Sequence, residues 1–177
     1  MVTKYKNILS EELYIELVEY INTLIKDKPH KFGTTNLLWE NGLIENSASI
    51  VRYDFDISDI LINKKIRKEI ENKIPYMVKG FCLHLWPNLS YITWHNDYHV
   101  KGALTIYLNE KWDANWGGYL MYKENSEIKA IKPERNLGVL QENNVEHSVT
   151  TINIGAEQRI SLQFFLEEKV KTTKTIL

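Results

Sequence analysis

The second half of the chain, from Tyr76 onward, is a series of short β-rich runs separated by turn residues. Turn residues separate the runs, as at Gly117-Gly118, Pro133 and Asn143-Asn144. The pattern predicts strands near 77–86, 90–97, 102–108, 118–123, 128–132, 137–141, 145–152 and 157–166. So many short strands at this spacing favour a β-sandwich or jelly roll over a βαβ fold.

The first 75 residues have helical periodicity instead. Leu13, Leu17, Ile21 and Leu24 recur at helical spacing after Ser10, a candidate N-cap. Ile62, Ile66, Ile70 and Ile74 form a second apolar stripe that begins near Ser58 and ends at Pro75. The runs TNLLWE and SIVRYDF are candidate edge strands. We therefore predict one domain over 1–177, mainly β, with a helical part at about 1–75 and a jelly-roll core at about 76–167.

Composition excludes some classes of partner. The net charge is −1, which gives no overall attraction to nucleic acid or to an anionic membrane, so we expect neither as a partner. Cys82 is the only cysteine, and no apolar stretch approaches the length of roughly 18 residues that a membrane span needs. These features predict a cytoplasmic protein that acts on a small molecule or a peptide.

Four polar residues of the β-rich half are candidates for one site. His95 and Asp97 are two residues apart, so on a strand they face the same side. His147 and Arg159 lie on consecutive predicted strands, and a hairpin centred near residue 153 would pair them across the strands. Two imidazoles and one carboxylate can bind iron(II) on one face and leave the other face open. The forked guanidinium of an Arg suits a carboxylate-bearing co-substrate.

Two neighbouring residues bear on this hypothesis. Ser161 lies two residues beyond Arg159, so it shares its face and offers a hydroxyl to the same carboxylate. His99 offers a rival triad with His95 and Asp97, but residues i and i+4 of a strand are about 13 Å apart, too far to share one metal. His84 is interpreted as a structural histidine. Each residue alone is weak evidence, and the order and spacing of the set carry the hypothesis.

With these residues placed, the chain resembles the 2-oxoglutarate- and iron(II)-dependent oxygenases, in their prolyl 4-hydroxylase-like branch. The resemblance spans about residues 80–167. Its motifs are His95-Asn96-Asp97, Tyr107-Leu108-Asn109, Trp116-Gly117-Gly118-Tyr119-Leu120, Lys132-Pro133, His147-Ser148-Val149 and Arg159-Ile160-Ser161. It implies a double-stranded β-helix (jelly-roll) core buttressed by α-helices. It also implies hydroxylation of an unactivated C–H bond with release of succinate and CO2.

The resemblance implies roles for individual residues. His95, Asp97 and His147 would hold Fe(II), and Arg159 with Ser161 would hold 2-oxoglutarate. O2 is the second co-substrate, and ascorbate is a candidate reductant. The family often has a Tyr nine residues before the first His, where this chain has Trp86, so Tyr91 or Tyr107 is expected to replace that hydroxyl. Asn136 stands where the family prefers Gly after Pro133, and Asn tolerates the left-handed backbone that such a turn needs.

Several alternatives stay open from the sequence. The substrate is a prolyl residue, a free amino acid or a small metabolite. A chain with this fold is alternatively a non-catalytic jelly-roll module that binds a metal or 2-oxoglutarate. A third interpretation is a cupin-like iron enzyme that does not use 2-oxoglutarate, for which Arg159 would have no co-substrate to bind.

Overall fold

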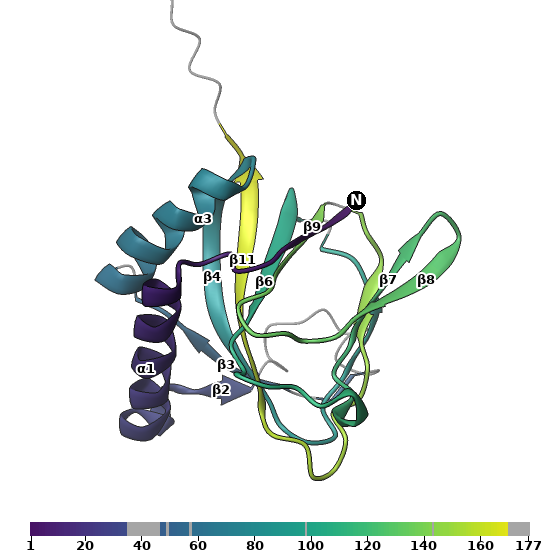
Figure 1. Cartoon of the computed structure of the whole chain (residues 1–177), viewed down its shortest axis with the longest axis horizontal. Helices are drawn as coiled ribbons and strands as arrows, with labels where there is room; N and C mark the ends of the chain where they lie inside the picture. The colour runs from purple at the N-terminus through teal and green to yellow at the C-terminus, as the bar shows by residue number, and fades with distance from the viewer. Residues whose placement is uncertain (35–46, 49, 57, 98, 143, 170–177) are drawn as a thin grey trace, which may run out of the picture.

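Two antiparallel sheets face one another, and the helices cover the outer side of the larger one (Figure 1). The computed structural model describes residues 1–34, 47–48, 50–56, 58–97, 99–142 and 144–169. The elements are β1 (Val2–Tyr5), α1 (Glu11–Asp27), η1 (Pro29–Lys31), β2 (Gly33–Thr34), β3 (Val51–Asp54), η3 (Leu61–Ile66), α3 (Arg67–Lys73), β4 (Tyr76–Trp86), β5 (Ile92–His95), β6 (Gly102–Tyr107), η4 (Ala114–Trp116), β7 (Leu120–Glu124), β8 (Glu127–Ile131), β9 (Gly138–Glu142), β10 (His147–Val149) and β11 (Arg159–Glu168). No helix among these described residues is long and apolar enough to cross a membrane.

The larger sheet has seven strands in the order β1-β9-β6-β11-β4-β3-β2. Alternate residues along β11 show which side chains each face of this sheet buries. Leu162, Phe164 and Leu166 are fully buried in the core cluster beneath the helices. Arg159 and Ser161 occupy the odd-numbered positions of the same strand and therefore face the other way, toward the smaller sheet. One face of this sheet thus packs against apolar helix residues, and the other face forms a wall of the interior between the sheets.

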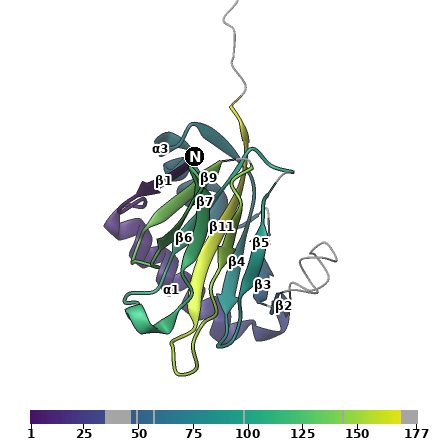
Figure 2. The ribbon, with the colours of Figure 1, turned by 90° about the vertical axis from the view of Figure 1, so that its right-hand side faces the viewer.

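The apolar stripes of the helices supply the first core cluster. Leu13, Leu17, Ile21 and Leu24 of α1 are buried, as the helical spacing predicts. Ile62, Ile66, Ile70 and Ile74 are also buried, and their segment is a π-helix (η3) that continues into α3 before Pro75. Ser10 does not cap α1 with its side chain, because its hydroxyl bonds Glu69 Oε2 at 3.2 Å. Figure 2, turned by 90° from Figure 1, shows the same helices behind the sheets.

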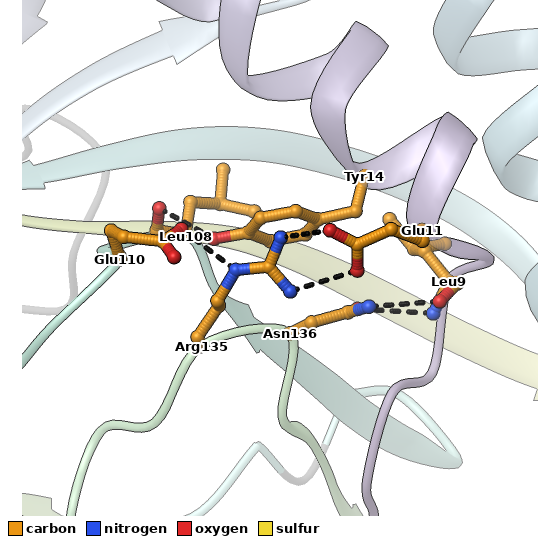
Figure 3. A network of polar contacts seen from close by, with 7 residues as sticks. All are labelled: Leu9, Glu11, Tyr14, Leu108, Glu110, Arg135 and Asn136. Atoms are coloured by element: carbon orange, nitrogen blue, oxygen red, sulfur yellow. Dashed lines mark hydrogen bonds and ion pairs between the residues drawn. The ribbon is translucent and has the colours of Figure 1, made fainter.

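A polar network fastens the start of α1 to two loops of the larger sheet (Figure 3). The side-chain amide of Asn136 bonds the backbone of Leu9 twice, accepting from its N–H at 3.0 Å and donating to its carbonyl at 2.8 Å. The Tyr14 hydroxyl donates to the carbonyl of Leu108 at 2.9 Å. Arg135 lies over the Tyr14 ring and pairs with both Glu11 and Glu110. Asn136 is buried with φ +54°, so the predicted left-handed turn is confirmed and its side chain also docks α1.

The smaller sheet has the order β5-β10-β7-β8 and packs over the interior face of the larger one. A second core cluster lies between the sheets and contains Ile92, Leu120 and Val149 from the smaller sheet and Tyr107 from the larger. All eight strands predicted after residue 76 are present, with ends shifted by a few residues. The run SIVRYDF contains β3, and TNLLWE lies outside the described residues. The fold is the mainly β jelly roll with few helices that the sequence predicted.

Candidate metal and co-substrate site

His95, Asp97 and His147 come together at the end of β5 and the start of β10. His95 and His147 are direct register partners in the smaller sheet, and their ring centroids are 4.2 Å apart. Asp97 follows β5 by two residues, and its Oδ2 lies 3.8 Å from Nε2 of His147. One ligand atom from each of the three residues lies within 4.8 Å of the others. This spacing is close to what donors around a single metal ion require.

Backbone contacts fix how both imidazoles are turned. Nδ1 of His95 lies 2.8 Å from the carbonyl oxygen of Thr93, and Nδ1 of His147 lies 2.9 Å from that of Val145. Because a carbonyl only accepts, each Nδ1 donates a proton to it, and each Nε2 is the ring atom left to bind a metal. Burial, together with the neighbouring His147, lowers the pKa of His95 to about 4, so this ring is neutral at pH 7. Neutral, oriented imidazoles are what a divalent metal needs as ligands.

Arg159 is a buried cation whose side chain lies between two aromatic rings. Its guanidinium carbon is 4.5 Å from the centre of the Trp86 ring and 4.9 Å from that of Tyr107. The residue is 1% exposed, and burial lowers the pKa of its guanidinium from its usual value, against a smaller opposing effect of the neighbouring Tyr107. Its Nε and Nη1, and the hydroxyl of Tyr107, have no hydrogen-bond partner. No carboxylate in the described part of the chain pairs with Arg159, so its buried donors fit an anion that comes from outside the chain.

Trp86 and Ser161 complete the surroundings of the guanidinium. The Trp86 indole N–H donates to the Ser161 hydroxyl oxygen at 3.0 Å, which leaves the Ser161 O–H as a further donor. Arg159 pairs with Trp86 across β11 and β4, and Ser161 pairs with Tyr107 across β11 and β6. Three adjacent strands thus present one group of donors to the interior. Sequence reasoning missed the role of Trp86. Strand alternation could have found it, because Trp86 lies two residues after His84 and so shares its inward face of β4.

The Gly117-Gly118 pair lets the chain pass close to Arg159. Both glycines have positive φ, +70° and +67°. A Cβ on Gly118 would lie 2.4 Å from Ile152 Cδ1 and 3.2 Å from Arg159 Cδ. A Cβ on Gly117 would lie 2.0 Å from the carbonyl oxygen of Thr151. The motif therefore supports the site through backbone conformation and close packing rather than through a functional group.

A single cavity of about 470 Å³ joins the metal-ligand candidates to Arg159 and Ser161. Ile92, Leu120 and Val149 supply apolar lining between them. Such a cavity, with apolar walls and a few converging polar groups, is typical of a small-molecule site. The donor set and the orphaned guanidinium fit an iron(II) ion and a carboxylate-bearing ligand.

The structure corrects the expected pairing of His147 with Arg159. The predicted hairpin between His147 and Arg159 is wrong, because β10 pairs with β5 and β7 whereas β11 pairs with β4 and β6. The two residues face the same cavity from opposite sheets, since the intervening turn carries the chain from one sheet to the other. His99 lines the cavity near Phe165 and is outside the cluster of three ligand candidates, as expected. Tyr107, and not Tyr91, lies against Arg159.

Comparison with known proteins agrees with this geometry. Residues 83–167 match the family model described as the 2OG-Fe(II) oxygenase superfamily, where 2OG is 2-oxoglutarate, and the family implies Fe(II), 2-oxoglutarate and O2. No curated protein sequence matches the chain. The predicted resemblance to this superfamily, in its prolyl 4-hydroxylase-like branch, is confirmed.

Solved structures extend the agreement over nearly the whole chain. A prolyl-4-hydroxylase from Pseudomonas putida matches with a TM-score of 0.69 and 16% identity, covering 95% of this chain and 92% of that one. A prolyl hydroxylase from Trichoplax adhaerens, in complex with a hypoxia inducible factor peptide, matches with a TM-score of 0.73 and 14% identity, covering 94% of this chain and 83% of that one. The viral collagen prolyl hydroxylase of Paramecium Bursaria Chlorella virus-1, in a 2OG complex, matches with a TM-score of 0.62 and 16% identity, covering 93% of this chain and 94% of that one. At these identities the structural matches show the fold.

Proposed function

We propose that this protein, whose residues 83–167 match the 2OG-Fe(II) oxygenase superfamily, is an enzyme that hydroxylates an unactivated C–H bond. One observation carries the proposal most directly. The same cavity holds two oriented imidazoles with a carboxylate at one place and a buried guanidinium with unpaired donors at another. An isolated metal site would not need the second feature, and an isolated anion site would not need the first.

In this proposal His95, Asp97 and His147 hold Fe(II). The backbone carbonyls of Thr93 and Val145 keep both Nδ1 atoms protonated, so that each Nε2 is turned to the metal. When bound, Fe(II) with 2-oxoglutarate supplies O2 activation that yields succinate, CO2 and a hydroxylated product. Three protein ligands would leave further coordination positions of the ion to the co-substrates.

Arg159, Ser161 and Tyr107 bind the distal carboxylate of 2-oxoglutarate. The unpaired Nε and Nη1 atoms of Arg159 suit a carboxylate that accepts from a planar fork. The Ser161 and Tyr107 hydroxyls add two donors from adjacent strands. Because Trp86 and Tyr107 stack on the guanidinium from two sides, it is already in place before the anion binds.

The substrate is an organic molecule whose C–H bond enters the cavity beside the metal. A prolyl residue of a peptide, a free amino acid and a small metabolite remain the three candidate classes. The peptide in the Trichoplax adhaerens complex supports the first class by analogy of fold only. The apolar residues Ile92, Leu120 and Val149 keep water from the space between metal and anion site.

The test is an anaerobic titration of the metal-free protein, first with Fe(II) and then with 2-oxoglutarate, followed by visible absorption. We expect a weak charge-transfer band that requires both additions. Arg159→Ala and the milder Arg159→Lys should weaken it, and Arg67→Ala, which only breaks a pair with Glu71 on α3, is the matched control. Iron binding without a band would refute the co-substrate assignment. Failure to bind iron would refute the metal site and favour a non-catalytic module.

A further inference from the structure

The cavity continues beyond Ser161 to a second group of polar side chains. Inward residues of β11 recur every second position, about 7 Å apart, so Gln163 and Phe165 follow Arg159 and Ser161 along the same wall. Gln163 pairs in register with Thr105 of β6, and Phe165 pairs with Ala103, which in turn pairs with Gln141 of β9. We call Thr105, Gln141 and Gln163 the amide end of the cavity. The roles proposed above for Arg159, Ser161 and Tyr107 do not involve it.

Gln141 is the most informative residue of the amide end. It is 3% exposed and lines the cavity, and its Nε2 has no hydrogen-bond partner. A buried amide that served only to hold the fold together would be expected to have its donors satisfied. The unpaired donor of a residue that lines a cavity is therefore explained by an acceptor atom that arrives with a ligand.

Gln163 presents a second donor to the same space. The Thr105 hydroxyl donates to Oε1 of Gln163 at 2.6 Å, which fixes the orientation of the amide. Since the carbonyl end is occupied, the amino end of Gln163 is left to face the cavity that the residue lines. Two side-chain amides on nearby strands thus offer N–H groups to a ligand.

The charges around the cavity point to the same class of ligand. Arg52 and Arg159 are the cations that line it, and Asp97, a proposed metal ligand, is the only carboxylate among the described lining residues. Arg52 pairs with Asp54 through Nε and Nη2, and Asp54 is exposed outside the cavity. Apart from Asp97, no described lining residue carries an anion that would pair with an ammonium or guanidinium group of a ligand.

We propose that Gln141 and Gln163 are specificity-determining residues, which donate hydrogen bonds to a carboxylate or amide carbonyl oxygen of a small-molecule substrate that has no ammonium group. This proposal rests on the proposed function, because it assigns the part of the cavity left after the metal and the co-substrate are bound. It separates the candidate substrates: an amino acid whose nitrogen is acylated fits the amide end, and the same amino acid with a free ammonium group does not.

The test uses the full chain in its anaerobic complex with Fe(II) and 2-oxoglutarate. The probes are N-acetylated amino acids, the same amino acids with a free amino group, and uncharged N-acetyl amino acid amides, with binding measured by saturation-transfer NMR and turnover by succinate release. We expect acetylated members to bind at least tenfold more tightly than their free counterparts. Preference for the acetylated acids over the uncharged amides would identify a carboxylate as the acceptor, and equal binding would identify the amide carbonyl.

Two variants of Gln141 separate a ligand-binding role from a structural one. Gln141→Leu should melt at the same temperature as the wild type or higher, since it removes an unpaired buried donor, and should bind the best acetylated probe at least tenfold more weakly. Gln141→Glu should weaken binding of that probe further and strengthen binding of the free amino acid. Thr105→Val is the control for structure, because it breaks the contact with Gln163 and should lower the melting temperature.

Three results would overturn the proposal. They are a lower melting temperature for Gln141→Leu with unchanged probe binding, tighter binding of free than of acetylated amino acids, and no binding of any acetylated probe. The iron and 2-oxoglutarate band of the wild type is recorded in the same samples. Its presence in any of these cases would leave the proposed function standing, whereas its absence would refute both.

Discussion

The indole of Trp86 and the hydroxyl of Ser161 are joined by a 3.0 Å hydrogen bond, so the ring that stacks on Arg159 also orients the donor beside it. The two residues lie on adjacent strands, β4 and β11. A single tryptophan therefore positions two of the three side chains that we propose bind the co-substrate.

Trp86→Phe should keep a ring over Arg159 and remove the N–H that bonds Ser161. A hydrogen bond of this kind contributes about 0.5–1.5 kcal/mol, so we expect the Kd for 2-oxoglutarate to rise about 2- to 13-fold. Anaerobic titration of the visible band measures it. If Trp86 acts through Ser161, adding Ser161→Ala to the Trp86→Phe variant should raise the Kd by a smaller factor than Ser161→Ala raises it in the wild type. Additive effects would contradict this positioning role.

Gly118→Ala should destabilise the protein and disturb Arg159. The residue has φ +67°, and the new Cβ would lie 2.4 Å from Ile152 Cδ1. Gly155→Ala is a matched control, since Gly155 has φ +86° and nothing within 4 Å of an added Cβ. Backbone strain alone costs about 1–2 kcal/mol, so Gly155→Ala should lower unfolding free energy by that amount and leave 2-oxoglutarate binding unchanged. Gly118→Ala should lower the unfolding free energy by more than this and should also weaken 2-oxoglutarate binding. Equal effects of the two variants in urea unfolding and in the titration would disprove the packing argument.

Asn136 should contribute to stability through its side chain as well as its backbone. Asn136→Gly permits φ +54° but removes both hydrogen bonds to Leu9, so we expect a loss of about 1–3 kcal/mol. Asn136→Ala should lose about 1 kcal/mol more, because Ala resists the left-handed conformation. Urea unfolding gives both values. A glycine variant as stable as the wild type would show that the contact with Leu9 in Figure 3 contributes little.

His84 should make the metal-free protein sensitive to acid. Burial, with smaller contributions from the charges of Arg52 and Arg159, lowers the pKa of His84 from 6.5 to about 3. Between these values the unfolded chain binds a proton that the folded protein does not. Stability is therefore present above about pH 6.5 and is lost as the pH falls, by about 1.4 kcal/mol per unit.

Between pH 7 and pH 5 the loss of unfolding free energy that is due to His84 amounts to about 2 kcal/mol. His84→Gln should remove that part of the pH dependence, and the difference between the two proteins isolates it from all other titrating groups. Urea unfolding at both pH values, with a chelator present, provides the measurement. Equal pH dependence in wild type and variant would mean that folding does not lower the pKa of His84.

Local sequence patterns predicted most of the strands and the residues that meet at the site. The β-rich runs and turn residues after Tyr76 were sufficient to locate eight strands, and the i, i+2 spacing correctly grouped His95 with Asp97. The short N-terminal strand β1 was not predicted. Its residues Val2–Tyr5 pair with β9, more than 130 residues later, and no local pattern reveals such a distant partner.

Pairing between strands was the part that sequence reasoning could not supply. A turn signal at Asn153-Ile154-Gly155 suggested a hairpin, but the chain crosses between the sheets there and β10 and β11 find other partners. For the same reason the unpaired amide of Gln141 could not be foreseen. An inward polar residue on a strand is visible in the sequence, but whether it has a partner depends on which strands lie beside it.

The metal-ligand candidates and the anion-binding candidates are on different sheets, His95 and His147 on the smaller and Arg159 and Ser161 on the larger. The span from metal to guanidinium is thus set by the thickness of the apolar layer between the sheets, to which Ile92, Leu120 and Val149 belong. Trimming or enlarging one of these side chains changes the length of the molecule that can bridge the two groups without touching any polar contact. Selection for one dicarboxylic acid over a shorter or longer homologue is therefore a property of core volume in this fold.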